Sequence, residues 1–312
     1  MTPYLCQYYL VDWCNAKCDF CGIWKNKPHK VSSLSRVRWD LEDLKRLSVK
    51  YIDFTGGEPL LRKEAPAVFE MAEELHLRYG FVSNGTFADR WKEFAHLSPY
   101  SVFFSLDSPR KDEHDNHRHY PLFDKVISSI NISKNLGWNP TLMFSPTRET
   151  FGRLEEMLDL ANQFDVLVNI NPVWGAPEKR LTDEQFSQLR SLNKDHRAFV
   201  DTRCIDMFLS GGNHIKNRTC RSMDTVITVA PDSSVYVPCY HHNVVQRDGG
   251  IYGIVKSDWW KEQSERAGRY PFCQNCNIAC YLGNGLTFKR PLETLKLMLM
   301  YRIKSTRSRS MT

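Results

Sequence analysis

Residues 4–21 read YLCQYYLVDWCNAKCDFC, an apolar and aromatic run that is followed directly by three cysteines. The run is typical of a buried β-strand. Similar short runs recur along the first half of the chain, at 51–54, 79–83, 101–106, 139–144 and from 166. Segments with apolar residues at helical spacing lie between them, at 40–47, 65–75, 123–136 and 152–164. This alternation predicts repeated βα units with parallel strands.

Six such units predict an α/β fold, a partial (β/α)6 TIM-like barrel. After about residue 175 the pattern changes to helices at 181–202 and 203–212 and then to a hairpin at 224–240, with Asp232 and Ser233 at its turn. The expected organisation is a core barrel over 1–210, a smaller α+β domain over 211–289, and a C-terminal helix with a basic tail over 290–312. In barrels of this type the chemistry lies at the C-terminal ends of the strands.

The composition excludes several classes of protein. A formal net charge of +6 is too small to indicate nucleic-acid binding, and no nucleic-acid partner is expected. No stretch approaches the ~20 apolar residues of a membrane-spanning helix, and the N-terminus lacks the pattern of a signal peptide. Ten cysteines in a chain of this kind indicate a reducing, cytoplasmic location in which thiols bind metal or do chemistry.

Cys14, Cys18 and Cys21 follow the first strand with the spacing CxxxCxxC. Such a short loop can give one thiolate to each of three irons of a [4Fe-4S] cluster, which leaves the fourth iron open to a substrate or cofactor. The alternative is a zinc knuckle with a distant histidine as its fourth ligand.

The second strand runs directly into Thr55-Gly56-Gly57-Glu58-Pro59. Two glycines let the backbone approach a ligand closely, and Glu58 offers a carboxylate to an ammonium group. Taken alone, this segment is also compatible with a tight turn.

Together the two segments resemble the radical S-adenosylmethionine (SAM) enzymes, in which an aromatic residue precedes the last cysteine, as Phe20 does here. The resemblance implies that the SAM amino and carboxylate groups chelate the open iron and that the GGEP segment contacts the amino group. It also implies that an electron from the cluster splits a C–S bond to give a 5′-deoxyadenosyl radical, and that flavodoxin or ferredoxin supplies the electron. The cluster ligands would be Cys14, Cys18 and Cys21, and the SAM-binding residues would include Phe20, Gly56, Gly57, Glu58 and Pro59.

Later strand ends carry polar residues where the family meets the SAM ribose and carboxylate, and these are Asn84, Ser105 and Asp107. Arg118 is a candidate for the SAM carboxylate, although His119 stands where the family usually has glycine. A solvated charged loop before a helix is the alternative for this segment.

Five further cysteines lie in the C-terminal region. Cys220 and Cys239 flank the hairpin, and Cys273, Cys276 and Cys280 follow as CQNCNIAC. They resemble the Twitch and SPASM extensions of radical SAM enzymes, whose full SPASM form has seven or more cysteines. The resemblance implies one auxiliary iron-sulfur cluster, of the [4Fe-4S] type, for electron transfer if four thiols bind it or for substrate if only three do. A structural zinc site is the alternative.

Other residues near these motifs have weaker assignments. His241 and His242 could donate a proton to the active site or simply pack over a cluster. Cys6 and Cys204 are expected to be buried apolar residues, and no catalytic residue is assigned.

Because only thirteen residues precede Cys14, we expect no N-terminal leader-binding domain and therefore expect a small-molecule or lipid-precursor substrate in preference to a peptide. A zinc-bound binding module without catalysis is the alternative from another class. The Leu- and Met-rich segment 291–304, with Lys296 and Arg302, either docks on the barrel, which is the favoured reading, or lies on an anionic membrane surface.

Overall fold

The computed structural model describes residues 2–27, 30–174, 177–246 and 250–307. Residues 308–312 of the expected basic tail therefore lie outside the described residues.

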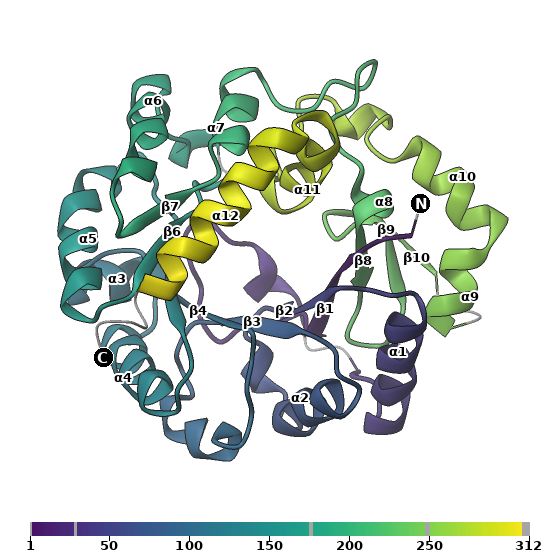
Figure 1. The fold of residues 1–312 in the computed structure, drawn as a ribbon, viewed down its shortest axis with the longest axis horizontal. Coiled ribbons are helices and arrows are strands. Elements are labelled where there is room, and N and C mark those ends of the chain that lie inside the picture. Colours follow the sequence, from purple (N-terminus) through teal and green to yellow (C-terminus); the bar gives the residue numbers. More distant parts are fainter. Residues whose placement is uncertain (1, 28–29, 175–176, 247–249, 308–312) are drawn as a thin grey trace.

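The described strands form one curved sheet, in the order β10-β9-β8-β1-β2-β3-β4-β5-β6-β7 (Figure 1). Neighbours from β8 through β1 to β7 are parallel, whereas β9 is antiparallel to both β8 and β10. The strands are β1 (Leu5–Val11), β2 (Tyr51–Gly56), β3 (Tyr79–Ser83), β4 (Ser101–Ser105), β5 (Pro140–Phe144), β6 (Leu167–Ile170), β7 (Ala198–Val200), β8 (Val226–Val229), β9 (Val235–Cys239) and β10 (His242–Gln246).

Helices cover the outer side of the arc, while α11 lies on its inner side and α12 crosses the opening (Figure 1). The α-helices are α1 (Leu34–Arg46), α2 (Ala65–Glu74), α3 (Lys111–Arg118), α4 (Phe123–Asn135), α5 (Leu154–Gln163), α6 (Asp183–Ser191), α7 (Thr202–Leu209), α8 (Ser222–Thr225), α9 (Gly250–Lys256), α10 (Asp258–Arg266), α11 (Ala279–Lys289) and α12 (Pro291–Arg307). The 3-10 segments are η1 (Ile23–Lys25), η2 (Pro59–Leu61), η3 (Ala88–Phe94), η4 (Phe151–Arg153), η5 (Pro177–Lys179), η6 (Leu192–Lys194) and η7 (Pro271–Cys273).

Strand β1 shows why these runs are almost continuously apolar. Cys6, Tyr8 and Leu10 are fully buried in the main core, and the Tyr8 hydroxyl donates to Asp40 of α1 at 2.7 Å. The alternate residues Gln7 and Tyr9 are also buried, on the opposite face of the strand. A parallel strand covered on both faces needs apolar residues at nearly every position.

The six strands expected from the sequence are all present, and the expected mostly parallel α/β architecture with a partial TIM-like barrel is confirmed. The prediction of one helix over 181–202 was wrong, because α6 ends at Ser191 and β7 follows within that range. The Asn193 side chain of η6 donates to the Val200 carbonyl and accepts from the Val200 N–H, and these two bonds hold the end of the short strand β7, which pairs with β6.

The hairpin expected over 224–240 is confirmed as β8 and β9, with Ser233 at a φ of 65° in its turn. Strand β8 also pairs in parallel with β1, so the hairpin continues the barrel sheet. The division of the chain at residue 210 stays a prediction. Segment 291–304 forms part of α12, as expected.

Candidate active site

The cysteine loop after β1 is tied to the end of α3. The Lys17 N–H donates to the Arg118 carbonyl at 2.9 Å, and the Asp19 N–H donates to the His117 carbonyl at 3.1 Å. Cys14, Cys18 and Cys21 share one small apolar cluster, and its other members are Ala16, Phe20, Tyr120 and Leu122. The fold therefore brings together the three thiols that the sequence groups by spacing.

Burial raises the pKa of the Cys14 thiol to about 11 and that of Cys18 to about 12, and it also raises the pKa of Cys21. The Arg118 guanidinium opposes this effect at Cys18. Thiols of this kind become ligands when a bound metal supplies positive charge that favours the thiolate.

The three thiols share one cluster of side chains, but they do not surround a single metal-ion position. Among the described residues, no three His, Cys, Asp or Glu side chains lie where they could hold a single metal ion together. An iron-sulfur cluster distributes its thiolates over several irons. Three thiols on one short loop fit a cluster that they bind through three of its irons.

Segment 55–59 packs its backbone directly on the cysteine loop. The Glu58 N–H donates to the Trp13 carbonyl at 3.2 Å. A Cβ on Gly57 would lie 1.9 Å from the Trp13 carbonyl oxygen, and one on Gly56, whose φ is 145°, would lie 2.0 Å from the Val11 carbonyl oxygen. In this structure the two glycines therefore allow backbone to approach backbone at the base of the cysteine loop.

Glu58 is fully buried and joins the ends of β2 and β3. Its carboxylate accepts from the Asn84 N–H at 2.7 Å, the Ser83 hydroxyl at 3.0 Å and the Leu60 N–H at 3.2 Å. Burial raises the pKa of Glu58 to about 7, against the effect of these hydrogen bonds. Pro59 follows as the first residue of η2 and is also buried.

Asn84 lies against the cysteine loop. Its Nδ2 is 3.7 Å from Cys14 Sγ and donates to Asn15 Oδ1 at 3.0 Å. Its Oδ1 accepts from the Thr86 N–H and hydroxyl at 2.9 and 2.6 Å, which fixes the orientation of the amide. The polar end of β3 thus contacts the first cysteine.

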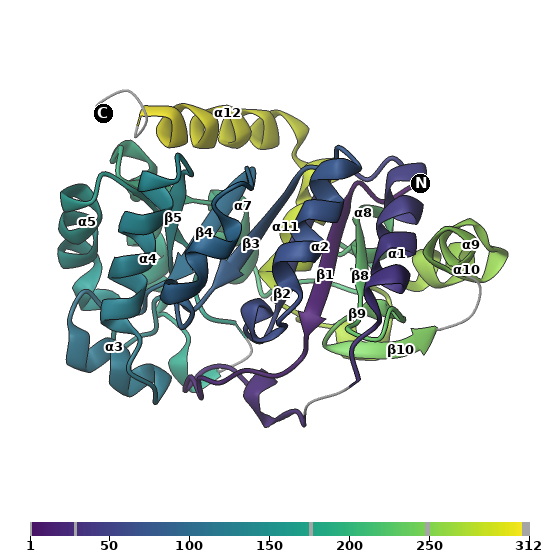
Figure 2. The same cartoon turned by 90° about the horizontal axis from the view of Figure 1, so that it is seen from below.

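Asp107 and Arg118 come together in a buried ion pair. Arg118 lies close enough to Cys14 and Cys18 for its charge to affect both pKa values. Ser105 ends β4 and is half-buried. The ends of β1 to β4 lie at one edge of the sheet, opposite α12 (Figure 2).

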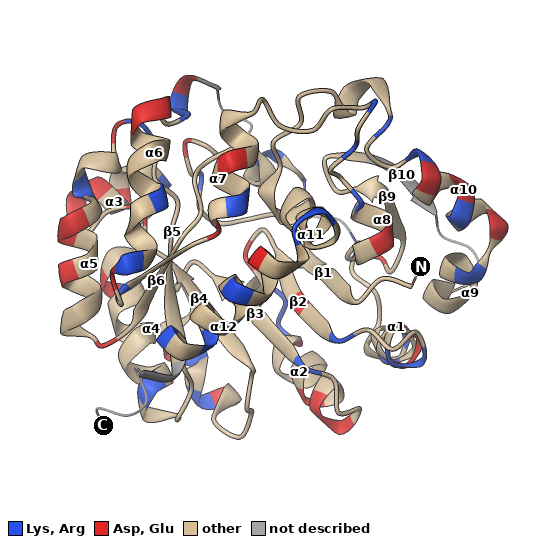
Figure 3. Ribbon diagram, turned by 45° about the horizontal axis from the view of Figure 1, so that its top comes forward, with Lys and Arg blue, Asp and Glu red and all other residues tan. Residues whose placement is uncertain are grey.

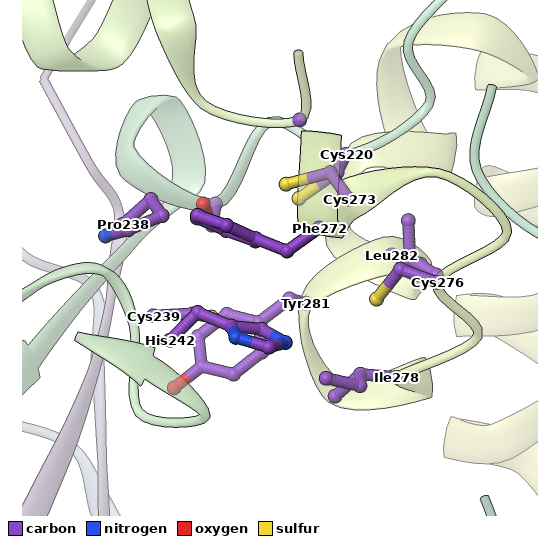
Figure 4. Close-up of a pocket in the computed structure, with 12 residues that line it drawn as sticks. Cys220, Pro238, Cys239, His242, Phe272, Cys273, Cys276, Ile278, Tyr281 and Leu282 are labelled. Carbon is purple, nitrogen blue, oxygen red and sulfur yellow. The ribbon is translucent and has the colours of Figure 1, made fainter. Parts of the chain in front are cut away.

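The C-terminal cysteines divide between two cavities. Four of them line a small cavity that also contains His242, Phe272 and Tyr281 (Figure 4), and they are Cys220, Cys239, Cys273 and Cys276. Burial, together with the smaller effect of the neighbouring thiols, raises the pKa of Cys220 to about 12 and that of Cys239 to about 11.

Cys280 lines a different cavity of about 260 Å³, between α11 and the ends of β6 and β7. Cys204, Asn169 and Asp201 line the same cavity. Burial raises the pKa of Cys280 to about 12, and a hydrogen bond from Gln7 of β1 partly opposes this rise. The fold therefore separates Cys280 from the lining of the four-thiol cavity, although its sequence spacing groups it with Cys276.

Asn213 holds the four-cysteine cavity together. Its Oδ1 accepts from the Cys220 N–H at 2.9 Å, its Nδ2 donates to the Cys273 carbonyl at 2.9 Å, and its N–H donates to the Cys276 carbonyl at 2.8 Å. Gly268 also receives a bond from this amide. Sequence reasoning missed Asn213, because an asparagine after two glycines looks like an ordinary loop residue.

A comparison with models of protein families finds a match in the N-terminal half of the chain. Residues 8–161 match the model of the radical SAM superfamily. The chain belongs to the radical SAM superfamily. This membership implies SAM and a [4Fe-4S] cluster as cofactors, and the loop of Cys14, Cys18 and Cys21 has donors suited to that cluster.

Three known proteins illustrate the similarity. A GTP 3′,8-cyclase of Thermodesulfovibrio yellowstonii is 30% identical over 42% of this chain and 43% of its own. The mycofactocin maturase MftC of Mycolicibacterium smegmatis is 24% identical over 54% of this chain and 44% of its own. The chain thus spans about two fifths of the length of these curated relatives. The structure of anSMEcpe with bound AdoMet superposes with a TM-score of 0.66 at 15% identity, over 96% of this chain and 98% of that chain.

Two further residues with shifted pKa values were missed by sequence reasoning or assigned only weakly. Asp53 of β2 pairs in register with Gln7, and desolvation raises its pKa to about 7. An acidic residue inside an apolar strand was the available signal. His241, a weak candidate for a proton donor, packs against Trp174 at 4.3 Å between ring centroids, and burial lowers its pKa to about 4.

Proposed function

We propose that this radical SAM protein cleaves SAM reductively at a cluster bound by Cys14, Cys18 and Cys21, and that it abstracts hydrogen from a small-molecule or lipid-precursor substrate. The observation that carries the proposal is the direct packing of segment 55–59 and Asn84 on the cysteine loop. When bound, the cluster supplies the electron that breaks a C–S bond of SAM.

The protein's own residues position these partners. Glu58 holds the ends of β2 and β3 in register through three accepted hydrogen bonds, and its place in the fold orients Asn84 toward Cys14. Arg118 brings positive charge to the cysteine loop, where it favours thiolates and suits a carboxylate ligand. The apolar neighbours of the cysteines, Phe20 and Leu122 among them, limit the access of water to the loop.

The cavity beside Cys280 is the candidate place for the substrate. Its volume of about 260 Å³ suits a small molecule or one group of a larger one. Its amide and charged side chains can fix the orientation of a polar substrate, and they belong to Asn169, Asn171, Asp201, Arg203 and Asn284. A peptide substrate is the second candidate, because the structure of Streptococcus suis SuiB bound to precursor peptide SuiA has a similar fold, with a TM-score of 0.68 at 12% identity.

The four thiols of the four-cysteine cavity support the proposal of one auxiliary iron-sulfur cluster, with Cys220, Cys239, Cys273 and Cys276 as its ligands. Four protein thiolates leave no iron open in a [4Fe-4S] cluster, so this arrangement favours electron transfer over direct binding of substrate. Cys280 would remain a thiol that faces the substrate cavity.

The test is anaerobic reconstitution with iron and sulfide, followed by dithionite and SAM, with 5′-deoxyadenosine as the measured product. Wild-type protein should form it, and Cys18→Ala should not. Cys6→Ala is the matched control, because Cys6 is also buried but lies in the main core, away from the cluster of Cys18, and should leave activity intact. Full SAM cleavage by Cys18→Ala would remove the assignment of the site.

A further inference from the structure

The outer face of α12 is apolar and exposed. The exposed fractions are 75% for Leu292, 66% for Leu295, 65% for Met298, 57% for Leu299 and 46% for Ile303. Residues three and four apart lie on one side of a helix, so these side chains form a continuous stripe. Isolated exposed apolar residues are ordinary, whereas a contiguous stripe marks a binding surface.

The opposite face of α12 is what docks on the barrel. Leu297 is buried, and the Lys304 ammonium donates to the carbonyls of Asn193 and Asp195 at 2.9 and 2.6 Å. The Tyr301 ring packs on Phe199 of β7 with 4.9 Å between centroids. The helix is therefore held to the barrel without using its apolar stripe.

The position of α12 leaves the stripe accessible along its length. The helix runs along one edge of the molecule, on the side opposite the cysteine loop (Figure 2). A planar surface can approach this edge and contact the whole helix.

The charges that share the exposed side of α12 with the stripe residues select the kind of surface. Lys296 and Arg302 are exposed on α12, where basic positions recur along the helix (Figure 3). The sequence of α12 contains a single acidic residue, Glu293, which pairs with Arg290 at 3.2 Å. Apolar side chains flanked by Lys and Arg are the pattern of a helix that lies in the interface of an anionic membrane.

We propose that α12 binds anionic lipid surfaces, lying flat with its apolar stripe at the boundary between headgroups and acyl chains. Among the described residues, no helix has the length and apolar character needed to cross a bilayer. An in-plane helix does not need that length. The proposal depends on the exposed face of α12 and not on the assignment of the active site.

Membrane binding through α12 would orient the enzyme. The cysteine loop lies on the far side of the barrel from α12 (Figure 2), so the side of the barrel that carries this loop would face the aqueous phase. The substrate would then reach the cluster from water and not from the bilayer beneath α12.

The experiment is sedimentation of the purified full chain with vesicles of phosphatidylglycerol and phosphatidylcholine in equal parts, and with vesicles of phosphatidylcholine alone. Wild-type protein should sediment with the anionic vesicles and do so less as salt is added. Leu299→Glu should lower the partition coefficient about tenfold, because it places a charge in the stripe. Trp39→Glu is the matched control, since Trp39 of α1 is 68% exposed and lies outside the stripe.

Three results would overturn the proposal. One is that wild-type protein sediments with neither kind of vesicle. Another is that Leu299→Glu and Trp39→Glu reduce binding to the same degree. The third is that wild-type protein is a dimer by gel filtration and Leu299→Glu is a monomer, which would assign the stripe to a second copy of the chain. Thermal unfolding monitored by circular dichroism would verify that both variants remain folded.

Discussion

Arg118 and Asp107 form a buried ion pair with two hydrogen bonds, 2.7 Å from Nε to Oδ2 and 3.0 Å from Nη2 to Oδ1. The Arg118 carbonyl also accepts from Lys17 of the cysteine loop. The pair thus connects the region after β4, the end of α3 and the loop that carries the cysteines. The guanidinium has five N–H donors, and the pair uses two of them.

Arg118→Gln should lower the free energy of unfolding by about 3 kcal/mol, because it leaves the buried Asp107 carboxylate without its partner. Urea unfolding followed by far-UV circular dichroism measures the change. The double variant Asp107→Asn with Arg118→Gln removes both charges and should recover part of the loss. A loss well below about 1 kcal/mol in Arg118→Gln would mean that the pair behaves like an exposed ion pair.

Gly57→Ala should disturb the cysteine loop, because a Cβ at this position would lie 1.9 Å from the Trp13 carbonyl oxygen. We expect a loss of about 2 kcal/mol in the free energy of unfolding and a reduced iron content after reconstitution. Gly22→Ala is the control next to the same loop, since nothing lies within 4 Å of a Cβ there. Equal iron contents in wild type and both variants would contradict the proposed coupling of the two segments.

Cys276→Ala and Cys280→Ala should differ in iron content, although the two cysteines are close in sequence. Cys276 lines the four-cysteine cavity and Cys280 lines the other one. If the protein binds two clusters of equal size, Cys276→Ala should lose about half of the iron and Cys280→Ala should retain it. Iron and acid-labile sulfide analysis provides the measurement, and loss of iron from Cys280→Ala would exclude the proposed ligand set.

Asp53→Asn should change how stability depends on pH. Desolvation raises the pKa of Asp53 from its ordinary 3.8 to about 7, so the folded state keeps its proton to a higher pH than the unfolded chain. The free energy of unfolding attributable to this group therefore falls as pH rises between these two values and levels off above them. Asparagine does not ionise, so the free energy of unfolding of Asp53→Asn lacks this pH-dependent loss. At pH values above about 7 the variant should therefore exceed wild type in free energy of unfolding by up to a few kcal/mol.

Urea unfolding of wild type and Asp53→Asn at about pH 5 and about pH 8 tests this expectation. Glu58 also titrates near the upper end of the window, but it is present in both proteins, so the difference between them isolates Asp53. Parallel pH profiles for the two proteins would contradict the raised pKa.

The parts of the fold that follow from local pattern were predictable. Six strands and their helices appear where apolar runs and helical periodicity place them, because each parallel strand is buried on both faces. The strand at Ala198–Val200 was hidden inside a helical pattern, and the Asn193 side chain that holds it acts through two bonds to Val200, seven positions later. Pairing of β8 with β1 joins residues more than two hundred positions apart, which no local signal specifies.

The sequence by itself determined the βα succession and the spacing of Cys14, Cys18 and Cys21, since both are properties of neighbouring residues along the chain. Only the tertiary structure decided that Asp107 pairs with Arg118 and that Cys280 lines a different cavity from the other C-terminal cysteines. Likewise only the packed barrel decided which face of α12 is buried, because Leu residues occupy both faces of that helix. Contacts between distant segments depend on how the whole sheet closes, and this closure is not encoded in any single stretch of residues.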